Sequence, residues 1–306
     1  MSRILRWGVP LVVSGGTLAF LLWQIDFREA LHHVDATVAG TIVPALLLYG
    51  AVSLVIEALS LARVTHAAGS PLTRWTCARI KAASYPLAIV HYALGVGGLT
   101  YLLRRHGALS ISRAAGVVGL IGFFDLGLLL AVTALGAGLL ATQAPEVRAS
   151  LVVAVVGAIL AGLAVLRTRR SFGSLDRLRD LELFRAARAA PAVLLLEVAV
   201  LRLLFVLVFI GLAAVSLVAF GIHVPLGDLV VCVTGIALVS ALPIAIAGLG
   251  TGQVAFVYLL RHWGEPEVLL ACSLVLSAGL IGMRAALGLL FAREFTREAL
   301  VHAAEG

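Results

Sequence analysis

The side chains with the greatest chemical potential in this sequence are charged residues that interrupt long apolar stretches. Asp125 lies inside the apolar stretch 114–141, and Arg202 lies inside the stretch 192–220. Each is about 10 residues from one end of its stretch, which corresponds to roughly 15 Å along a helix. A charge at the centre of a membrane-spanning helix costs ~2.5–3.5 kcal/mol. We therefore expect both to face the protein interior, where they either pair or line a polar path.

A proline and several glycines break the apolar segment 229–260. Pro243, Gly248 and Gly250 lie in the middle of this segment, and Gln253 follows them with an uncharged amide that can both donate and accept hydrogen bonds. Backbone groups freed by such a break cannot bond to water at membrane depth, so the break must be buried in protein or line a wet cavity. The pattern predicts a re-entrant helical hairpin, an element on which transporters build binding sites.

A similar break occurs in the first half of the chain, within the segment 82–103. A gapless shift of 157 residues aligns Pro86 with Pro243, Gly95 with Gly252, and Tyr101–Arg104 with Tyr258–Arg261. Chance matching in a chain rich in Leu, Ala and Gly is the alternative, but the paired prolines favour a true repeat. His91 falls at this first break, where it is either a hydrogen-bonded structural residue or a proton relay.

The composition places the whole chain in a membrane. Hydrophobic residues make up 61% of the 306 residues, only 13% are charged, and the mean hydropathy is +1.09. No soluble domain of this length could bury so much apolar surface, so we expect an all-α polytopic membrane protein. The net charge of +7 then reports loop topology rather than nucleic-acid binding. We find no catalytic, metal-binding or cofactor motif, and the three cysteines are scattered; we expect no enzyme, metal or cofactor.

Arginine-rich loops set the expected topology. We expect a protein of the cell inner (plasma) membrane. If both broken segments enter the membrane and return to the same face, every basic loop and both termini lie in the cytoplasm. Six full transmembrane helices remain, at 8–25, 41–62, 114–141, 151–166, 192–220 and 266–291. The two hairpins then enter from opposite faces, which is the inverted-repeat plan of many secondary transporters.

This topology describes a single membrane domain, 1–306, in two halves. The first half is about 1–141 and the second about 150–293. The stretch 167–190, which contains seven arginines, joins them as an amphipathic helix on the cytoplasmic leaflet or as a solvated linker helix.

The remaining charged residues of the spans lie nearer their cytoplasmic ends. Arg284 is close enough to the end of its span for its side chain to snorkel, although a contact with a lipid phosphate is the alternative. Glu57 and Glu197 are also close to span ends, and we expect them to be partly hydrated.

The second break closely resembles a known family signature. Leu242–Gly250 is similar to the Pro-hydrophobic-small-hydrophobic-Gly-Gly-Leu-Gly motif of the lysylphosphatidylglycerol synthase transmembrane-region family, which is flippase-like and often lacks a synthase domain. Gly95, Tyr101–Arg105 and Phe123–Leu126 look like its amino-terminal motifs. The resemblance covers most of the chain and implies a lipid-handling membrane fold.

Three departures from the family pattern remove charge. Gln253 stands where the family commonly has an acid after Gly-Leu-Gly, and Val96 stands where it has an acid after the glycine matched by Gly95. Ile121 and Gly122 replace its Glu-Arg pair. The loss suggests a weakly charged or largely apolar lipid, such as an isoprenoid or hopanoid-type molecule.

We expect a protein that moves or binds a membrane lipid at a midplane site between the two hairpins. The residues expected along this lipid path are Pro86, His91, Gly95, Asp125, Arg202, Pro243, Gly248, Gly250, Gln253 and Arg284. The alternative is a non-catalytic membrane partner or anchor for a lipid- or envelope-modifying enzyme.

Overall fold

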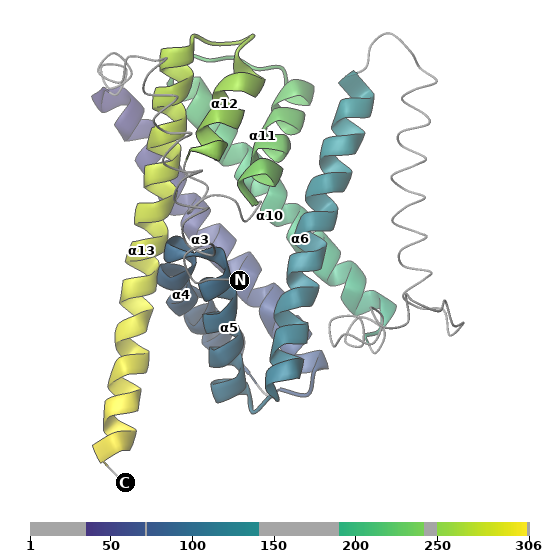
Figure 1. Ribbon diagram of the computed structural model, residues 1–306, viewed down its shortest axis with the longest axis vertical. Coiled ribbons are helices and arrows are strands. Elements are labelled where there is room, and N and C mark those ends of the chain that lie inside the picture. Colours follow the sequence, from purple (N-terminus) through teal and green to yellow (C-terminus); the bar gives the residue numbers. More distant parts are fainter. Residues whose placement is uncertain (1–34, 71, 141–189, 242–249, 305–306) are drawn as a thin grey trace, which may run out of the picture. The chain divides into compact units, whose positions relative to one another are not determined.

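A computed structural model describes residues 35–70, 72–140, 190–241 and 250–304. Within these ranges the chain is all-α, with eight helices and no strands (Figure 1). The helices are α3 (Ala36–Ala67), α4 (Arg74–Val90), α5 (Tyr92–Gly107), α6 (Ile111–Leu140), α10 (Ala192–Ala219), α11 (Leu226–Ala241), α12 (Thr251–Leu260) and α13 (Pro266–Ala304).

Four of these helices are long and apolar enough to cross a membrane. The candidate spans are Ala36–Ala67, Ile111–Ala137, Ala192–Ala219 and Pro266–Phe291, and they correspond to four of the six expected spans. Large apolar side chains such as Leu47, Leu48 and Leu207 are more than half exposed, as lipid-facing side chains of a membrane-embedded protein must be. The expected spans 8–25 and 151–166, and the linker 167–190, lie outside the described residues.

The described chain divides into two compact units. Unit 1 takes its residues from 1–49, 126–158 and 206–281, and unit 2 takes its residues from 50–125, 159–205 and 282–306. Unit 1 therefore contains the α11–α12 pair and unit 2 contains the α4–α5 pair. The core of unit 2 is formed by α3, α4, α5, α6 and α10. It includes Leu61, Ile80, Leu103, Val117 and Val198, all at most 1% exposed.

Helices α4 and α5 form a hairpin around one extended residue. His91 has φ −162° and ψ 134°, ends α4 and caps α5, accepting a hydrogen bond from the Ala93 N–H at its Nδ1, 3.1 Å away. At the other end, a Cβ on Gly107 would lie 2.7 Å from Ser70 Oγ and 3.1 Å from Leu72 Cδ1. The chain therefore returns to where α4 began, as the expected break at His91 requires.

Helices α11 and α12 also lie side by side (Figure 1). Cys232 Sγ donates to the Leu259 carbonyl at 3.5 Å, and a Cβ on Gly264 would lie 3.3 Å from Ile222, which precedes α11. This segment therefore also folds back on itself. The break between the two helices, 242–249, lies outside the described residues.

The two hairpins occupy equivalent places in the helix order. Each follows one long helix and precedes another, α3 and α6 in the first case and α10 and α13 in the second. The 157-residue shift moves α3 onto 193–224 and α6 onto 268–297, close to the observed bounds of α10 and α13. The bound that differs most within the first hairpin is the start of α4, which begins at Arg74 rather than near residue 82.

Gly95 sets how closely α4 and α5 approach near the break, and this gives a testable prediction. A Cβ at Gly95 would lie 2.5 Å from the Ala88 Cβ and 2.7 Å from the Ala88 Cα. Because a backbone atom cannot move aside alone, we expect Gly95→Ala to destabilise the protein by about 1–3 kcal/mol. Thermal unfolding in detergent measures the effect.

Gly97→Ala is the matched control for this substitution. Gly97 is on the same helix, with nothing within 4 Å of the position that an added methyl group would take, and alanine is favoured over glycine inside a helix by about 1 kcal/mol. It should leave the unfolding temperature unchanged or raise it. Equal effects of the two substitutions would contradict the close approach at Gly95.

Candidate functional site

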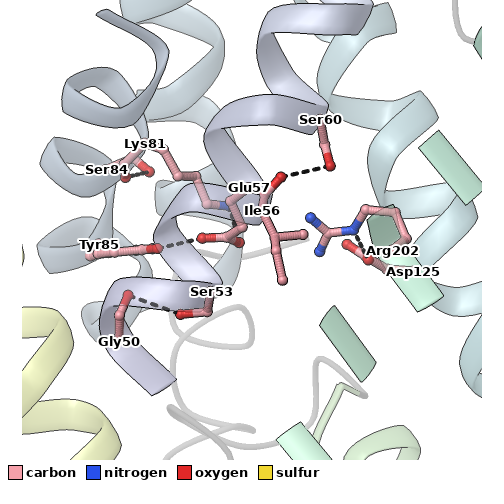
Figure 2. A network of polar contacts seen from close by, with 10 residues as sticks. All are labelled: Gly50, Ser53, Ile56, Glu57, Ser60, Lys81, Ser84, Tyr85, Asp125 and Arg202. Atoms are coloured by element: carbon pink, nitrogen blue, oxygen red, sulfur yellow. Dashed lines mark hydrogen bonds and ion pairs between the residues drawn. The ribbon is translucent and has the colours of Figure 1, made fainter. Parts of the chain in front are cut away.

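The first part of the site is an ion pair between α3 and α4 within unit 2. Lys81 Nζ lies 2.9 Å from Glu57 Oε1, and the Tyr85 hydroxyl donates a hydrogen bond to Glu57 Oε2 (Figure 2). The Glu57 side chain is 11% exposed and that of Lys81 is 24% exposed. The carboxylate is therefore held by one cation and one hydroxyl. Glu57 was expected to be partly hydrated; its side chain keeps 11% exposure, and its carboxylate also has these two protein partners.

Helical spacing brings these groups together. Ser53, Glu57 and Ser60 are spaced as residues that share one face of α3, and Lys81 and Tyr85 share one face of α4. Ser53 Oγ and Ser60 Oγ donate to carbonyls of their own helix, at 3.2 Å and 2.8 Å. Those hydroxyls are satisfied locally, so Glu57 is the side chain of this face that reaches α4 (Figure 2).

The second part of the site is the pair between Asp125 of α6 and Arg202 of α10. Arg202 Nε donates to Asp125 Oδ1 at 2.6 Å, and the guanidinium carbon lies 4.4 Å from the centre of the Phe205 ring. The Arg202 side chain is 2% exposed and that of Asp125 is 35% exposed. Of the two alternatives that the sequence left open, the structure shows the pairing; a role along a lipid path stays a prediction. The Asp125 carboxylate balances the positive charge of Arg202, which a buried arginine in an apolar helix requires.

The two pairs form one group, which we call the charged cluster: Glu57, Lys81, Tyr85, Asp125 and Arg202. The charges of Lys81 and Arg202 both act on Glu57, and those of Lys81 and Glu57 act on Asp125. Its side chains come from α3, α4, α6 and α10 (Figure 2). With two acids and two bases, the cluster has no formal net charge.

The cluster lies beside the break of the first hairpin. Tyr92 is the first residue of α5, is 66% exposed, and lies within electrostatic range of Asp125. Asp125 is also near the middle of its candidate span, about 20 Å from each end at helical rise. The break and the charges therefore occur together in unit 2, near the middle of a candidate span.

In unit 1, the side chain of Gln253 stabilises the start of α12 by hydrogen bonds. Its side chain is 1% exposed; Oε1 accepts from the Gly250 N–H at 2.6 Å, and Nε2 donates to Ser277 Oγ of α13 at 3.1 Å. Gly250 has φ +91°, a conformation that favours glycine. Both residues thus shape the hairpin and join it to α13.

A scan against protein-family models decides the relationship of this chain to known proteins. The model described as the lysylphosphatidylglycerol synthase TM region matches residues 7–288. The chain belongs to this family. No curated protein and no solved structure matches it.

The other expected path residues of this family member take different places. Pro86 lies inside α4, where a Cβ on Gly288 of α13 would approach its ring to 2.4 Å, so Pro86 and Gly288 mark a close helix contact in unit 2. Arg284 is exposed on α13. Pro243 and Gly248, which carry the core of the family motif, lie outside the described residues.

Sequence reasoning did not single out the Glu57, Lys81 and Tyr85 group of this family member. A signal was present, because Lys81 is the only lysine among 23 basic residues and Tyr85 follows it by one helical turn. Expecting the region before residue 82 to be a loop concealed this spacing. In the part of the chain that the structure describes, no group of three His, Cys, Asp or Glu side chains could hold a metal ion.

Proposed function

We propose that this membrane protein binds a lipid and moves its headgroup between leaflets past the charged cluster. The observation that carries the proposal is the cluster itself, four charges held in two ion pairs between apolar helices beside the break at His91. Charges at such depth are costly and typically mark substrate or ion paths. Broken helices at membrane depth serve the same purpose in many transporters.

The balance of charge in the cluster favours a particular class of headgroup. Each cation already has an acid partner, as Lys81 has Glu57 and Arg202 has Asp125, so no excess charge is available to retain a strongly anionic or cationic group. A headgroup that is neutral overall can exchange hydrogen bonds with the cluster without leaving a buried charge unpaired. This agrees with the missing acids at Val96 and Gln253.

The family supports the lipid part of the proposal, since its description names the transmembrane region of a lipid synthase. We propose a plasma-membrane location with both termini in the cytoplasm, on the basis of the basic loops, and a role without catalysis. The re-entrant course of the hairpins, their inverted arrangement and a site between them stay predictions, because each hairpin belongs to a different unit.

Reconstitution of the full chain into vesicles tests the proposed function. Fluorescent lipids with anionic, zwitterionic and uncharged headgroups are placed in both leaflets, and a membrane-impermeant quencher reports arrival in the outer one. We expect faster exchange than in empty vesicles for at least one class with no net charge. Rates equal to those of empty vesicles for every class would contradict the proposal and favour the membrane-partner alternative.

A further inference from the structure

A cavity of about 620 Å³ lies at the opposite end of the hairpin from the break, within unit 2. Three segments line it, the end of α3, the turn into α4 and the start of α10. The lining residues with ionisable side chains are Arg63, His66, Arg74 and Glu197, and apolar residues such as Leu72, Val193 and Leu194 complete the wall. This volume is in the range of small-molecule sites, about 300–1,000 Å³.

The cavity carries an excess of positive charge. Arg63 Nε pairs with Glu197 Oε2 at 3.3 Å, which neutralises the acid. Arg74 has no ion-pair partner within the part of the chain that the structure describes. Arg74 is the first residue of α4, where backbone N–H groups add to the positive potential. The cavity therefore attracts an anion.

Several features place this cavity at the headgroup level of a membrane. The candidate spans of α3, α10 and α13 end or begin at Ala67, Ala192 and Phe291. Trp75 is 62% exposed and packs edge-on against Phe291, with ring centroids 5.7 Å apart. Exposed tryptophans are common at membrane–water interfaces. An occupant at this level meets polar headgroups on one side and acyl chains on the other.

We propose that this cavity binds the phosphate of an anionic phospholipid, such as phosphatidylglycerol, with Arg74 as its main contact and the apolar wall against the upper acyl chains. Arginine suits the phosphate because its planar guanidinium can donate two parallel hydrogen bonds. Basic residues at one end of membrane helices retain anionic lipids of the adjacent leaflet. This lipid is a resident of unit 2 and is separate from the lipid that passes the charged cluster.

Thermal unfolding of the purified full chain in detergent, with added lipid, tests the site. Phosphatidylglycerol should raise the unfolding temperature more than phosphatidylcholine of the same chain length, and salt should reduce the difference. Arg74→Gln should raise roughly tenfold the phosphatidylglycerol concentration that gives half of the stabilisation, which corresponds to the loss of one charged contact. Arg105→Gln, an exposed arginine outside the cavity, should leave it unchanged.

A second variant and a second ligand complete the test. Val193 lines the cavity and is 67% exposed, so Val193→Trp places a large side chain there without removing a charge. Like Arg74→Gln, it should weaken the stabilisation by phosphatidylglycerol. Inorganic phosphate and glycerol 3-phosphate should be inactive at the concentrations at which the lipid acts. Equal stabilisation by the two lipids, equal effects of Arg74→Gln and Arg105→Gln, or full activity of inorganic phosphate would each overturn the proposal.

Discussion

Asp125→Leu should be among the most destabilising single substitutions in this protein, costing about 3–5 kcal/mol of unfolding free energy. The substitution leaves the guanidinium of Arg202, 2% exposed, without the carboxylate that lies 2.6 Å from its Nε. The Phe205 ring, 4.4 Å away, compensates only a part of that charge. Unfolding of the purified variant in detergent, followed by temperature or denaturant, measures the loss.

The reverse substitution and the double variant isolate the pair itself. Arg202→Met should cost less than Asp125→Leu, because the Asp125 side chain is 35% exposed and can be partly hydrated. The double variant should be closer to the wild type than Asp125→Leu, since no buried charge remains. If Asp125→Leu unfolds at the wild-type temperature, or if the two single effects simply add, the pair does not support the fold in this way.

Lys81→Met should both destabilise unit 2 and slow lipid movement. It removes the cation 2.9 Å from Glu57, whose side chain is 11% exposed, so a buried carboxylate is left with the Tyr85 hydroxyl as its partner from α4. We expect a cost of about 3 kcal/mol, at the lower end for a broken buried pair because that hydrogen bond persists. Lipid exchange in vesicles should fall roughly tenfold, which corresponds to about 1.4 kcal/mol in the barrier.

Two control variants distinguish the loss of the positive charge at position 81 from the effects of any substitution or of any lost cation. Lys81→Arg keeps the positive charge and should retain most of the stability. Arg113→Met removes an exposed cation at the start of α6 and should change neither readout. The proposed role of the cluster fails if Arg113→Met slows exchange as much as Lys81→Met does, or if Lys81→Met exchanges lipid at the wild-type rate while remaining folded.

The long helices and the first break follow from local sequence pattern. Apolar stretches of sufficient length predict α3, α6, α10 and α13, because burial in lipid needs only length and low charge. A break in the segment 82–103 was predicted from its proline and glycines. The structure places the break at His91, five residues after Pro86, which lies inside α4. The Asp125–Arg202 pair was one of two arrangements that the sequence allowed, since opposite charges at similar depths can either pair or line a polar path.

The start of α4 and the contacts of Glu57 were not predictable in the same way. Arg74, Arg79 and Lys81 make that segment look like a cytoplasmic loop, yet Cys77 and Ile80 between them are fully buried and hold the helix against the core of unit 2. Which acid meets Lys81 depends on how α3 packs on α4. That packing joins residues 24 positions apart in sequence, beyond the reach of local periodicity.

The most direct test of the account uses a lipid with a photoreactive group on its headgroup. The probe, uncharged overall, is incorporated into vesicles with the full chain, activated by light, and the labelled peptides are identified by mass spectrometry. We predict labelling around His91 and Tyr92, beside the charged cluster, that an excess of the unlabelled lipid suppresses. Labelling confined to the ends of the spans, with none at the break, would contradict the passage of a headgroup through this part of the protein.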